Sequence, residues 1–286
     1  MKVAIIGAGV MGRWLADFSK KKLGEVTIFN IRPLKAKKVA SELGVKAGSF
    51  EDAVADADIV LIAVPIPYTP KFVKAAAKIA KKGALVADVA SVKSDVVKTM
   101  RKIKGNIELV SIHPLFGPGA SSLKGKDFVV VPVKPGKRYS EIKKLFVKLG
   151  ARVTEMGAEE HDKVMAIIQC MTHFVLLTYL HAIKSMKGSK RAKELRTPMF
   201  AKLMTVAKSI LAGNPKLYGE LQAHNKYAKV ARSSVLEACR TLNATFSTGD
   251  AKMVETAFNE ALAPFGADEI RRAYQELYRQ FEGETS

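Results

Sequence analysis

The sequence predicts an α/β fold with a doubly wound parallel sheet, followed by an all-helical second domain. Three observations lead to this prediction. An apolar, largely β-branched run at residues 2–6 passes directly into G-A-G-V-M-G at residues 7–12. Further apolar runs typical of buried parallel strands alternate with helical periodicity as far as about residue 155. From residue 158 the strand-like runs disappear, and helical periodicity continues to the C-terminus.

The glycine motif lies between a predicted strand and a predicted helix, which is the context that makes G-x-G-x-x-G indicative of a dinucleotide site. Gly7 permits the tight turn, Gly9 lets the backbone approach a pyrophosphate, and Gly12 lets the helix pack closely on the strand. The helix N-terminus then faces the anion. A glycine-rich turn without a ligand is the alternative. The residues predicted to bind the cofactor here are Gly7, Ala8, Gly9, Val10, Met11 and Gly12.

The alternation of runs predicts individual elements in both domains, with the boundary between residues 156 and 157. After the first strand, the predicted strands are 25–30, 59–65, 85–88, 107–111, 128–132 and 152–155. Beyond the helix that follows the glycine motif, predicted helices of the first domain include 50–55, 69–81, 94–102 and 139–149. In the second domain the predicted helices are 158–187, 198–211, 214–224, 227–245, 250–262 and 267–282.

The composition is that of a globular protein, with a positive charge that surface solvation and attraction of anions explain better than nucleic-acid binding. It has 286 residues with 48% apolar and 26% charged residues, and its formal net charge at pH 7 is +20. The lysines are scattered along helical faces, and no zinc spacing, aromatic RNA-binding strand or basic arm accompanies them. We therefore expect attraction of polyanionic ligands, no nucleic-acid partner and no metal site.

Cysteine usage and hydropathy indicate the compartment. Cys170 and Cys239 form neither a disulfide framework nor a metal pair, which fits a reducing, cytoplasmic location. The most apolar long stretch, residues 165–183, contains Gln169 and two histidines. We expect it to be a helix buried in protein, with no role for a membrane.

The end of the second predicted strand bears on the choice of cofactor. A dinucleotide-binding fold usually presents an acid there to the adenine ribose. Here Asn30 takes that place, followed by Arg32 and Lys35. A carboxylate would repel a 2′-phosphate, whereas an asparagine with a guanidinium would accept one. The sequence favours NADP, with NAD as the alternative and with a merely solvated helix start as the other interpretation of the basic residues.

Three other strand ends carry residues suited to a ligand site, because ligands of open α/β sheets bind beyond the carboxyl ends of the strands. Val64 and Pro65 form a rigid apolar turn along the cofactor, and Ser91 offers a hydroxyl. His113 lies at a strand end in a Gly/Pro-rich loop, where an imidazole can take a proton from a hydroxyl at neutral pH. A histidine that only bonds the loop backbone is the alternative.

Taken together, these residues resemble the prephenate/arogenate dehydrogenase family of tyrosine biosynthesis over nearly the whole chain. Residues 113–118, H-P-L-F-G-P, are similar to the family signature H-P-M-F-G-P. Residues 88–93, D-V-A-S-V-K, resemble its D-x-x-S-x-K segment. Residues 160–162, E-H-D, followed by Q-C-M-T-H at 169–173, resemble its E-H-D…Q-x-x-T/R-H helix.

The resemblance implies an NAD(P)-dependent oxidoreductase that converts prephenate to 4-hydroxyphenylpyruvate by oxidative decarboxylation. His113 would take the proton of the ring C4 hydroxyl, and Ser91 would bond that hydroxyl and help to orient His113. From the helical domain, Gln169, Thr172 and His173 would line the substrate pocket. Many members bind a substrate carboxylate with an arginine of this domain, but residues 200–218 contain none. The substitutes we consider are Lys208 and Arg196.

Other functions remain compatible with the sequence. Arogenate, or another β-hydroxy acid or imine, could replace prephenate as the substrate of the same fold. A dinucleotide-binding regulator without turnover would leave His113 with a structural role. We also expect, by analogy with two-domain dehydrogenases, a homodimer formed through the helical domain.

Overall fold

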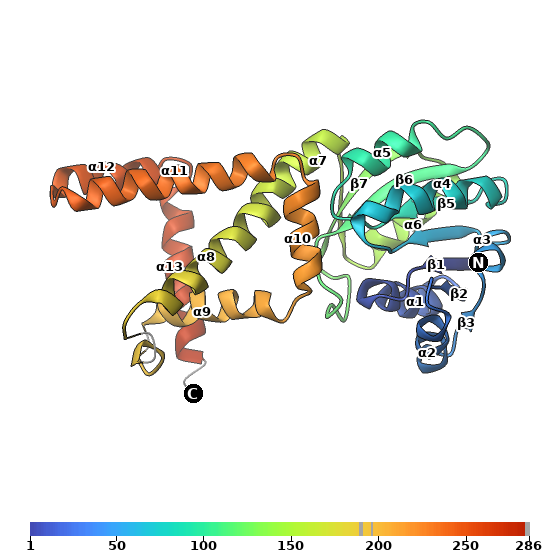
Figure 1. Ribbon diagram of the computed structural model, residues 1–286, viewed down its shortest axis with the longest axis horizontal. Helices are drawn as coiled ribbons and strands as arrows, with labels where there is room; N and C mark the ends of the chain where they lie inside the picture. Colours follow the sequence, from blue (N-terminus) through green and yellow to red (C-terminus); the bar gives the residue numbers. More distant parts are fainter. Residues whose placement is uncertain (189–190, 196, 284–286) are drawn as a thin grey trace. The chain divides into compact units, whose positions relative to one another are not determined.

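The computed structural model describes residues 1–188, 191–195 and 197–283, and the chain divides into two compact units, Met1–Met165 and Ala166–Ser286. The first unit contains one eight-stranded sheet with flanking helices (Figure 1). Among the described residues, the second unit is helical throughout. The predicted fold class, a dinucleotide-binding α/β domain followed by a helical domain, is therefore confirmed.

The elements of the first unit alternate along the chain. Its strands are β1 Lys2–Ile6, β2 Glu25–Phe29, β3 Lys46–Ala47, β4 Ile59–Ile62, β5 Leu85–Asp88, β6 Glu108–Pro114, β7 Asp127–Lys134 and β8 Arg152–Glu155. Its helices are α1 Val10–Lys22, α2 Pro33–Leu43, α3 Phe50–Val54, the 3₁₀ turn η1 Ile66–Tyr68, α4 Thr69–Ile79, α5 Ser94–Met100, α6 Lys137–Lys148 and α7 Ala158–Met165.

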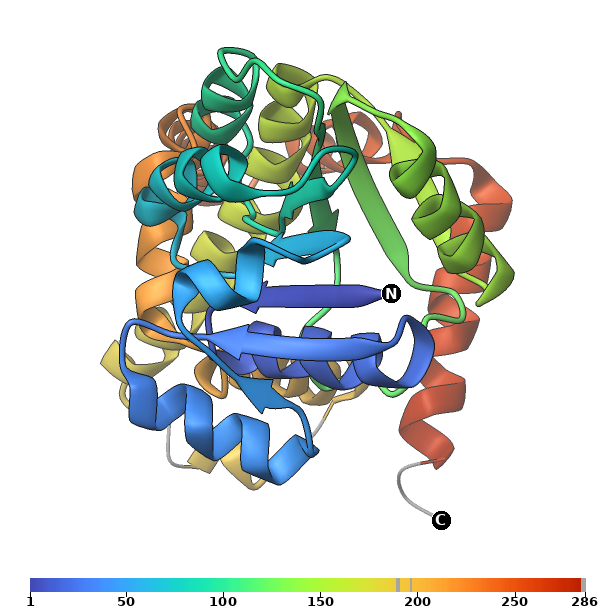
Figure 2. The same cartoon turned by 90° about the vertical axis from the view of Figure 1, so that its right-hand side faces the viewer.

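The strand order in the sheet is β3-β2-β1-β4-β5-β6-β7-β8. The pairs from β3 through β6 are parallel, whereas β7 runs antiparallel to β6 and β8 parallel to β7. The order reverses between β1 and β4, which is the topological switch point where such sheets bind ligands. Figure 2 shows β1 in the middle of the sheet, beginning at the N-terminus label.

Both faces of the sheet are covered, which explains the continuous apolar strands. Along β1, Val3 and Ile5 join a core with α1, α2 and α6, whereas Ala4 and Ile6 join a second core with α3, α4 and α5. Successive strand side chains point to opposite faces, so one short strand supplies both cores.

The turn from β1 into α1 depends on two glycines. Gly7 has φ +118°, and a Cβ there would lie 2.2 Å from the carbonyl oxygen of Ala63, just after β4. A Cβ on Gly12 would lie 1.8 Å from the carbonyl oxygen of Gly7. These contacts bring α1 directly against the switch point. Gly9, the N-cap of α1, differs because a Cβ there would meet no protein atom within 4 Å.

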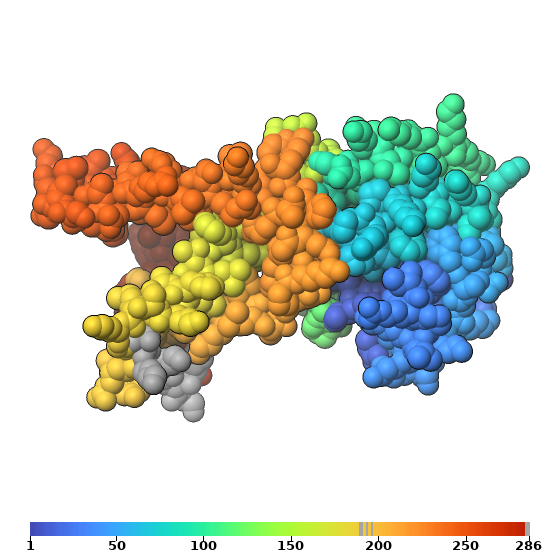
Figure 3. All heavy atoms as spheres, viewed as in Figure 1, coloured from blue at the N-terminus to red at the C-terminus, as the bar shows by residue number. Residues whose placement is uncertain are grey.

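The second unit begins inside a long helix. The run from Ala158 to Ser185 passes from α7 through a π-helical segment into the next helix. The helical elements of this unit are η2 Ala166–Met171, α8 Thr172–Ser185, the 3₁₀ turn η3 Arg191–Lys193, α9 Pro198–Leu211, α10 Pro215–His224, α11 Ala228–Ser247, α12 Ala251–Leu262 and α13 Ala267–Gly283. Helices α11 and α12 pack side by side (Figures 1 and 3).

Much of the apolar surface of the second unit is exposed in the single chain. The helix Ala158–Ser185 is long and apolar enough to cross a membrane by length and composition, and only 11% of its most apolar window is buried. Ile167 is 60% exposed and Ile168 is 50% exposed. The expectation that residues 165–183 are buried is therefore not met within one chain. Helices α12 and α13 also have no buried residue.

We predict that Gly12→Ala destabilises the first unit by about 3 kcal/mol, because the new methyl group overlaps backbone that cannot move independently of β1. The matched change Gly9→Ala should alter stability by less than about 0.5 kcal/mol, since its methyl group enters open space. Urea denaturation of both variants measures the difference. Equal destabilisation would contradict this account of the turn.

Candidate active site

The carboxyl ends of β1, β4, β5 and β6 lie together at one edge of the sheet, because these strands are parallel neighbours in register. The glycine turn follows β1, and Val64 and Pro65 follow β4. Ser91 lies in the turn after β5 and is partly exposed. His113 is within the last two residues of β6, opposite Val129 of β7, and is 2% exposed. The topology thus gathers these four predicted segments at one edge.

The glycine turn fits the pyrophosphate of a dinucleotide. Gly9 caps α1 with extended backbone, and the side that a Cβ would occupy is free of protein atoms. The first N–H groups of α1 have no partner in their own helix and attract an anion.

The end of β2 carries the residues considered for the adenine ribose. Asn30 Oδ1 accepts the backbone N–H of Arg32 at 2.9 Å, so the asparagine shapes the turn into α2. The side chains of Arg32 and Lys35 are exposed beside it.

The loop after β6 is attached to the first helix. Trp14 Nε1 donates a hydrogen bond to the carbonyl oxygen of Ala120 at 2.8 Å. Its ring stacks on Phe18 at 5.4 Å between centroids and meets Phe116 edge-on at 5.2 Å. The helix that begins at the glycine turn therefore also holds the H-P-L-F-G-P loop.

His113 belongs to a buried chain of polar side chains. Its Nδ1 lies 2.9 Å from Nε2 of His161 on α7, and Nδ1 of His161 lies 2.8 Å from Oδ1 of Asp162. The Asp162 carboxylate also accepts the backbone N–H groups of Lys93 and Ser94 at 2.8 and 2.9 Å, and the Ser94 hydroxyl. Asp162 therefore caps the N-terminus of α5 while it holds His161.

A buried ion pair lies next to this chain. Lys93 and Asp88 are fully buried, and Lys93 Nζ donates to Asp88 Oδ1 at 3.0 Å and to the carbonyl oxygen of Ile112 at 2.8 Å. Burial lowers the pKa of Lys93, although the Asp88 carboxylate opposes that change. The bond to Ile112 places the ammonium group one residue before His113.

Burial and charge set the protonation states of the histidines. Burial lowers the pKa of His113 well below its ordinary value, and the Lys93 charge and His161 lower it further. Burial also lowers the pKa of His161, against the opposing effect of Asp162. For Asp162, burial raises the pKa, but the bonds from His161, Ser94 and Lys93 outweigh burial and lower it. At neutral pH, His113 and His161 are therefore neutral imidazoles, and Asp162 is an ionised carboxylate.

Comparison with known proteins identifies the family. Residues 15–155 match the model of the prephenate dehydrogenase nucleotide-binding domain, and residues 157–260 match that of the prephenate dehydrogenase dimerization domain. The chain belongs to the prephenate/arogenate dehydrogenase family. This confirms the resemblance drawn from the sequence motifs.

Individual relatives carry several substrate names. A probable arogenate/prephenate dehydrogenase of Methanocaldococcus jannaschii is 27% identical over 96% of this chain, which spans 63% of that protein's length. A 4-amino-4-deoxyprephenate dehydrogenase of Streptomyces pristinaespiralis is 27% identical over 92% of this chain and 90% of its own. A crystal structure of Aquifex aeolicus prephenate dehydrogenase with hydroxyphenyl propionate and NAD⁺ has a TM-score of 0.72 at 21% identity, over 92% and 96% of the two chains.

The predicted substrate residues lie in the second unit. Gln169 is in the π-helical segment, whereas Thr172 and His173 begin α8. The His173 ring contacts the Tyr218 ring edge-on at 4.6 Å, and partial burial lowers the pKa of His173. A π-helical segment changes which side chains share a helix face, and such segments are frequent at functional sites.

Lys208 and Arg196 are the two basic residues predicted to bind a substrate carboxylate. Lys208 is an exposed residue of α9, and Arg196 lies outside the described residues.

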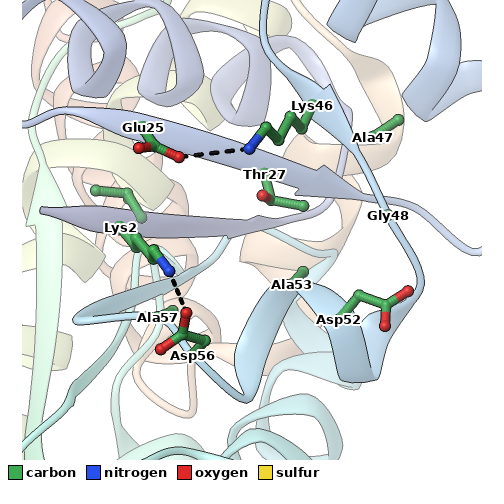
Figure 4. A pocket seen from close by; sticks show the side chains of 11 residues that line it. Lys2, Glu25, Thr27, Lys46, Ala47, Gly48, Asp52, Ala53, Asp56 and Ala57 are labelled. Carbon is green, nitrogen blue, oxygen red and sulfur yellow. Dashed lines mark hydrogen bonds and ion pairs between the residues drawn. The ribbon is translucent and has the colours of Figure 1, made fainter.

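One cavity lies away from the carboxyl edge. It has a volume of about 320 Å³ and is formed at the starts of β1, β2 and β3 and along α3 (Figure 4). Ion pairs join Lys2 to Asp56 and Lys46 to Glu25 across it. Since ligands of open α/β sheets bind at the opposite strand ends, we assign this cavity no part in the site.

Sequence reasoning gave His161, Asp162 and Lys93 no part in the site. In the structure, Asp162 of α7 caps α5 through the backbone N–H groups of Lys93 and Ser94. The available signals were the E-H-D and D-x-x-S-x-K motifs, because both contain polar residue types that are rare in a protein core. No local pattern reveals their contacts, since Lys93 and Asp162 are 69 positions apart and His113 and His161 are 48 apart.

We predict that the stability of the protein falls as pH decreases from about 7.5 to about 5.5. The unfolded state binds protons at His113 and His161 near their ordinary pKa, whereas the folded state resists protonation, so each histidine costs up to about 1.4 kcal/mol per pH unit. Urea denaturation of wild type and His113→Asn should show a smaller pH slope in the variant. His181→Asn, at an exposed histidine of α8, is the control; an unchanged slope in His113→Asn would refute the assignment.

Proposed function

We propose that this protein oxidises prephenate to 4-hydroxyphenylpyruvate and CO₂ with NAD(P)⁺ in tyrosine biosynthesis, and that it acts in the cytoplasm. The observation that supports this most is His113, a neutral, buried imidazole held by His161 at the same carboxyl edge of the sheet as the glycine turn after β1. Its place in the site gives a base where oxidation of a hydroxyl requires one.

In the proposed reaction, His113 takes the proton of the C4 hydroxyl. Ser91, at the neighbouring strand end, bonds the same hydroxyl. The bound nicotinamide supplies the acceptor for the hydride from C4. Carbonyl formation at C4 then drives loss of the C1 carboxylate as CO₂, because the ring becomes aromatic, and His113 returns its proton to the product oxygen. Proton removal is the step that this chain's own residues control.

The second part of the chain would complete the site and the assembly. We assign cofactor binding to residues 1–156, and substrate contacts and homodimer formation to residues 157–286. Exposed apolar residues on η2, α8 and α9 support a second copy as the cover for these helices. Gln169, Thr172 and His173 would contact the substrate, and Lys208 would bind a carboxylate.

The cofactor proposal is NADP. It rests on the exposed guanidinium of Arg32 beside Asn30 at the end of β2, and on Lys35 one helical turn further on. NAD is the alternative, and it is the cofactor named with the Aquifex enzyme.

Arogenate is the second candidate substrate, because the relatives carry both names and because residues 200–218 contain no arginine. The deciding experiment incubates the dimeric protein separately with prephenate, arogenate and 4-amino-4-deoxyprephenate, each with NADP⁺ or NAD⁺. Reduction of the nicotinamide is followed by absorbance, and the aromatic product is identified. Prephenate is expected to have the highest kcat/KM. Failure of all three substrates would leave a dinucleotide-binding regulator.

We predict that His113→Asn lowers kcat by roughly 10²- to 10⁴-fold, the range for loss of a general base. Because the pKa of His113 is lowered, the base form persists in acid, so the acid limb of wild-type kcat/KM should lie below pH ~6.5. Steady-state kinetics across pH measures both effects, with His181→Asn as control. Near-full turnover by His113→Asn at neutral pH would exclude His113 as the base.

We predict that Arg32→Ala reduces the ratio of kcat/KM for NADP⁺ over NAD⁺ by about tenfold, equivalent to one lost charge-assisted hydrogen bond of about 1.4 kcal/mol. Lys37→Ala removes the same charge from an exposed position of α2 and should change the ratio less than about twofold. An NAD⁺ preference that is the same in wild type and Arg32→Ala would refute the role of Arg32.

A further inference from the structure

We infer that His161 and Asp162 are positioning residues that fix the tautomer of His113 and compensate the charge it gains on taking a proton. This inference rests on the proposed role of His113 as base. It starts from two distances, 2.9 Å between the His113 and His161 rings and 2.8 Å between His161 and Asp162. All three side chains are at least 98% buried, so water does not compete for these bonds.

The tautomers of both histidines follow from the ionised carboxylate of Asp162. An ionised carboxylate only accepts hydrogen bonds, so His161 donates its Nδ1–H to Asp162. A neutral imidazole with a proton on Nδ1 has a lone pair on Nε2. His161 Nε2 therefore accepts, and the His113 nitrogen that faces it, Nδ1, donates. By the same rule, neutral His113 carries its lone pair on Nε2.

This assignment decides whether His113 works as a base. If His161 were absent or in the other tautomer, Nδ1 of His113 would have no acceptor, and its proton could sit on Nε2 instead. A proton on Nε2 would occupy the nitrogen that must accept the C4 hydroxyl proton. An aspartate that holds a histidine in its working tautomer acts by the same logic in hydrolases. Here a second histidine lies between the two groups.

The hydrogen bonds from His113 through His161 to Asp162 would also stabilise the positive charge that forms during the reaction. When Nε2 of His113 accepts the proton, the ring becomes a cation in a buried site that already contains the Lys93 ammonium group. The Nδ1–H of His113 points at His161, and its proton can shift to Nε2 of His161 while Nδ1–H of His161 stays bonded to Asp162. The positive charge then lies next to a carboxylate. The charged groups around His113 are Lys93 and Asp88 from β5 and its turn, and Asp162 from α7.

Asp162 also caps α5, so its replacement tests structure and chemistry together. His161 offers a cleaner test through two variants of similar size. In His161→Gln, the amide oxygen can accept the Nδ1–H of His113 but cannot titrate. In His161→Met, no acceptor remains, although a thioether suits a buried position better than an amide.

The test combines kinetics with ¹⁵N NMR of histidine-labelled, full-length protein, with His113 assigned by its loss in His113→Asn. In wild type we expect Nδ1 protonated and Nε2 unprotonated at neutral pH. His161→Met should shift His113 toward the opposite tautomer and lower kcat by roughly 10²- to 10⁴-fold with little change in KM. His161→Gln should keep the wild-type tautomer and remain at least about tenfold more active than His161→Met.

The opposite order would overturn the inference. If His161 only packs the core, His161→Met should be the more stable and more active variant, and the His113 tautomer should be the same in both. Asp162→Asn provides a second NMR test. Loss of the carboxylate should shift the tautomer population of His113 in the same direction as His161→Met does. The NMR measurement needs no substrate. A wild-type tautomer as predicted, without turnover of any substrate, would refute the proposed function and leave the hydrogen-bond chain in place.

Discussion

The arrangement of residues around His113 depends on the hydrogen bonds that the Asp162 carboxylate accepts. This carboxylate accepts hydrogen bonds from the backbone N–H groups of Lys93 and Ser94 at the start of α5 and from His161, so it fixes α7 against α5. A buried carboxylate without these donors would cost several kcal/mol. The same bonds that make its burial tolerable set the orientation of the His161 ring, and through it that of His113.

A second buried charge limits what this site can do. Lys93 lies fully inside the unit, bonded to Asp88 and to the carbonyl oxygen of Ile112. Burial lowers the pKa of His113, and the positive charge of Lys93 lowers it further, so both effects favour a neutral His113. If His113 acts as the proposed base, the charge it gains needs a negative charge nearby, which Asp162 would supply from the other side of His161.

The glycine turn and the H-P-L-F-G-P loop are joined by α1. Gly7 and Gly12 bring the start of this helix against β4, and Trp14 one turn later holds the loop after β6 through Ala120 and Phe116. The cofactor cradle and the strand that carries His113 therefore share one rigid element. The second unit differs in character, because its helices leave large apolar side chains such as Ile167 and Phe258 exposed in one chain.

Local patterns were sufficient to predict the fold class, and they proposed His113 and Ser91 as site residues, but they left out His161, Asp162 and Lys93. Helix α9 has the bounds that its periodicity predicted, and the glycine motif lies between strand and helix as expected. The two residues of β3 were missed because so short a strand has no periodicity, and β6 was ended early because His113 and Pro114 resemble a loop until they pair with β7. Only the folded chain brings His161 and Asp162 to His113 and Lys93, because contacts between residues far apart in sequence arise from packing. The motifs therefore pointed to His113 as the proposed base, whereas the contacts with His161 and Asp162 that would set its tautomer and charge arise only in the folded chain.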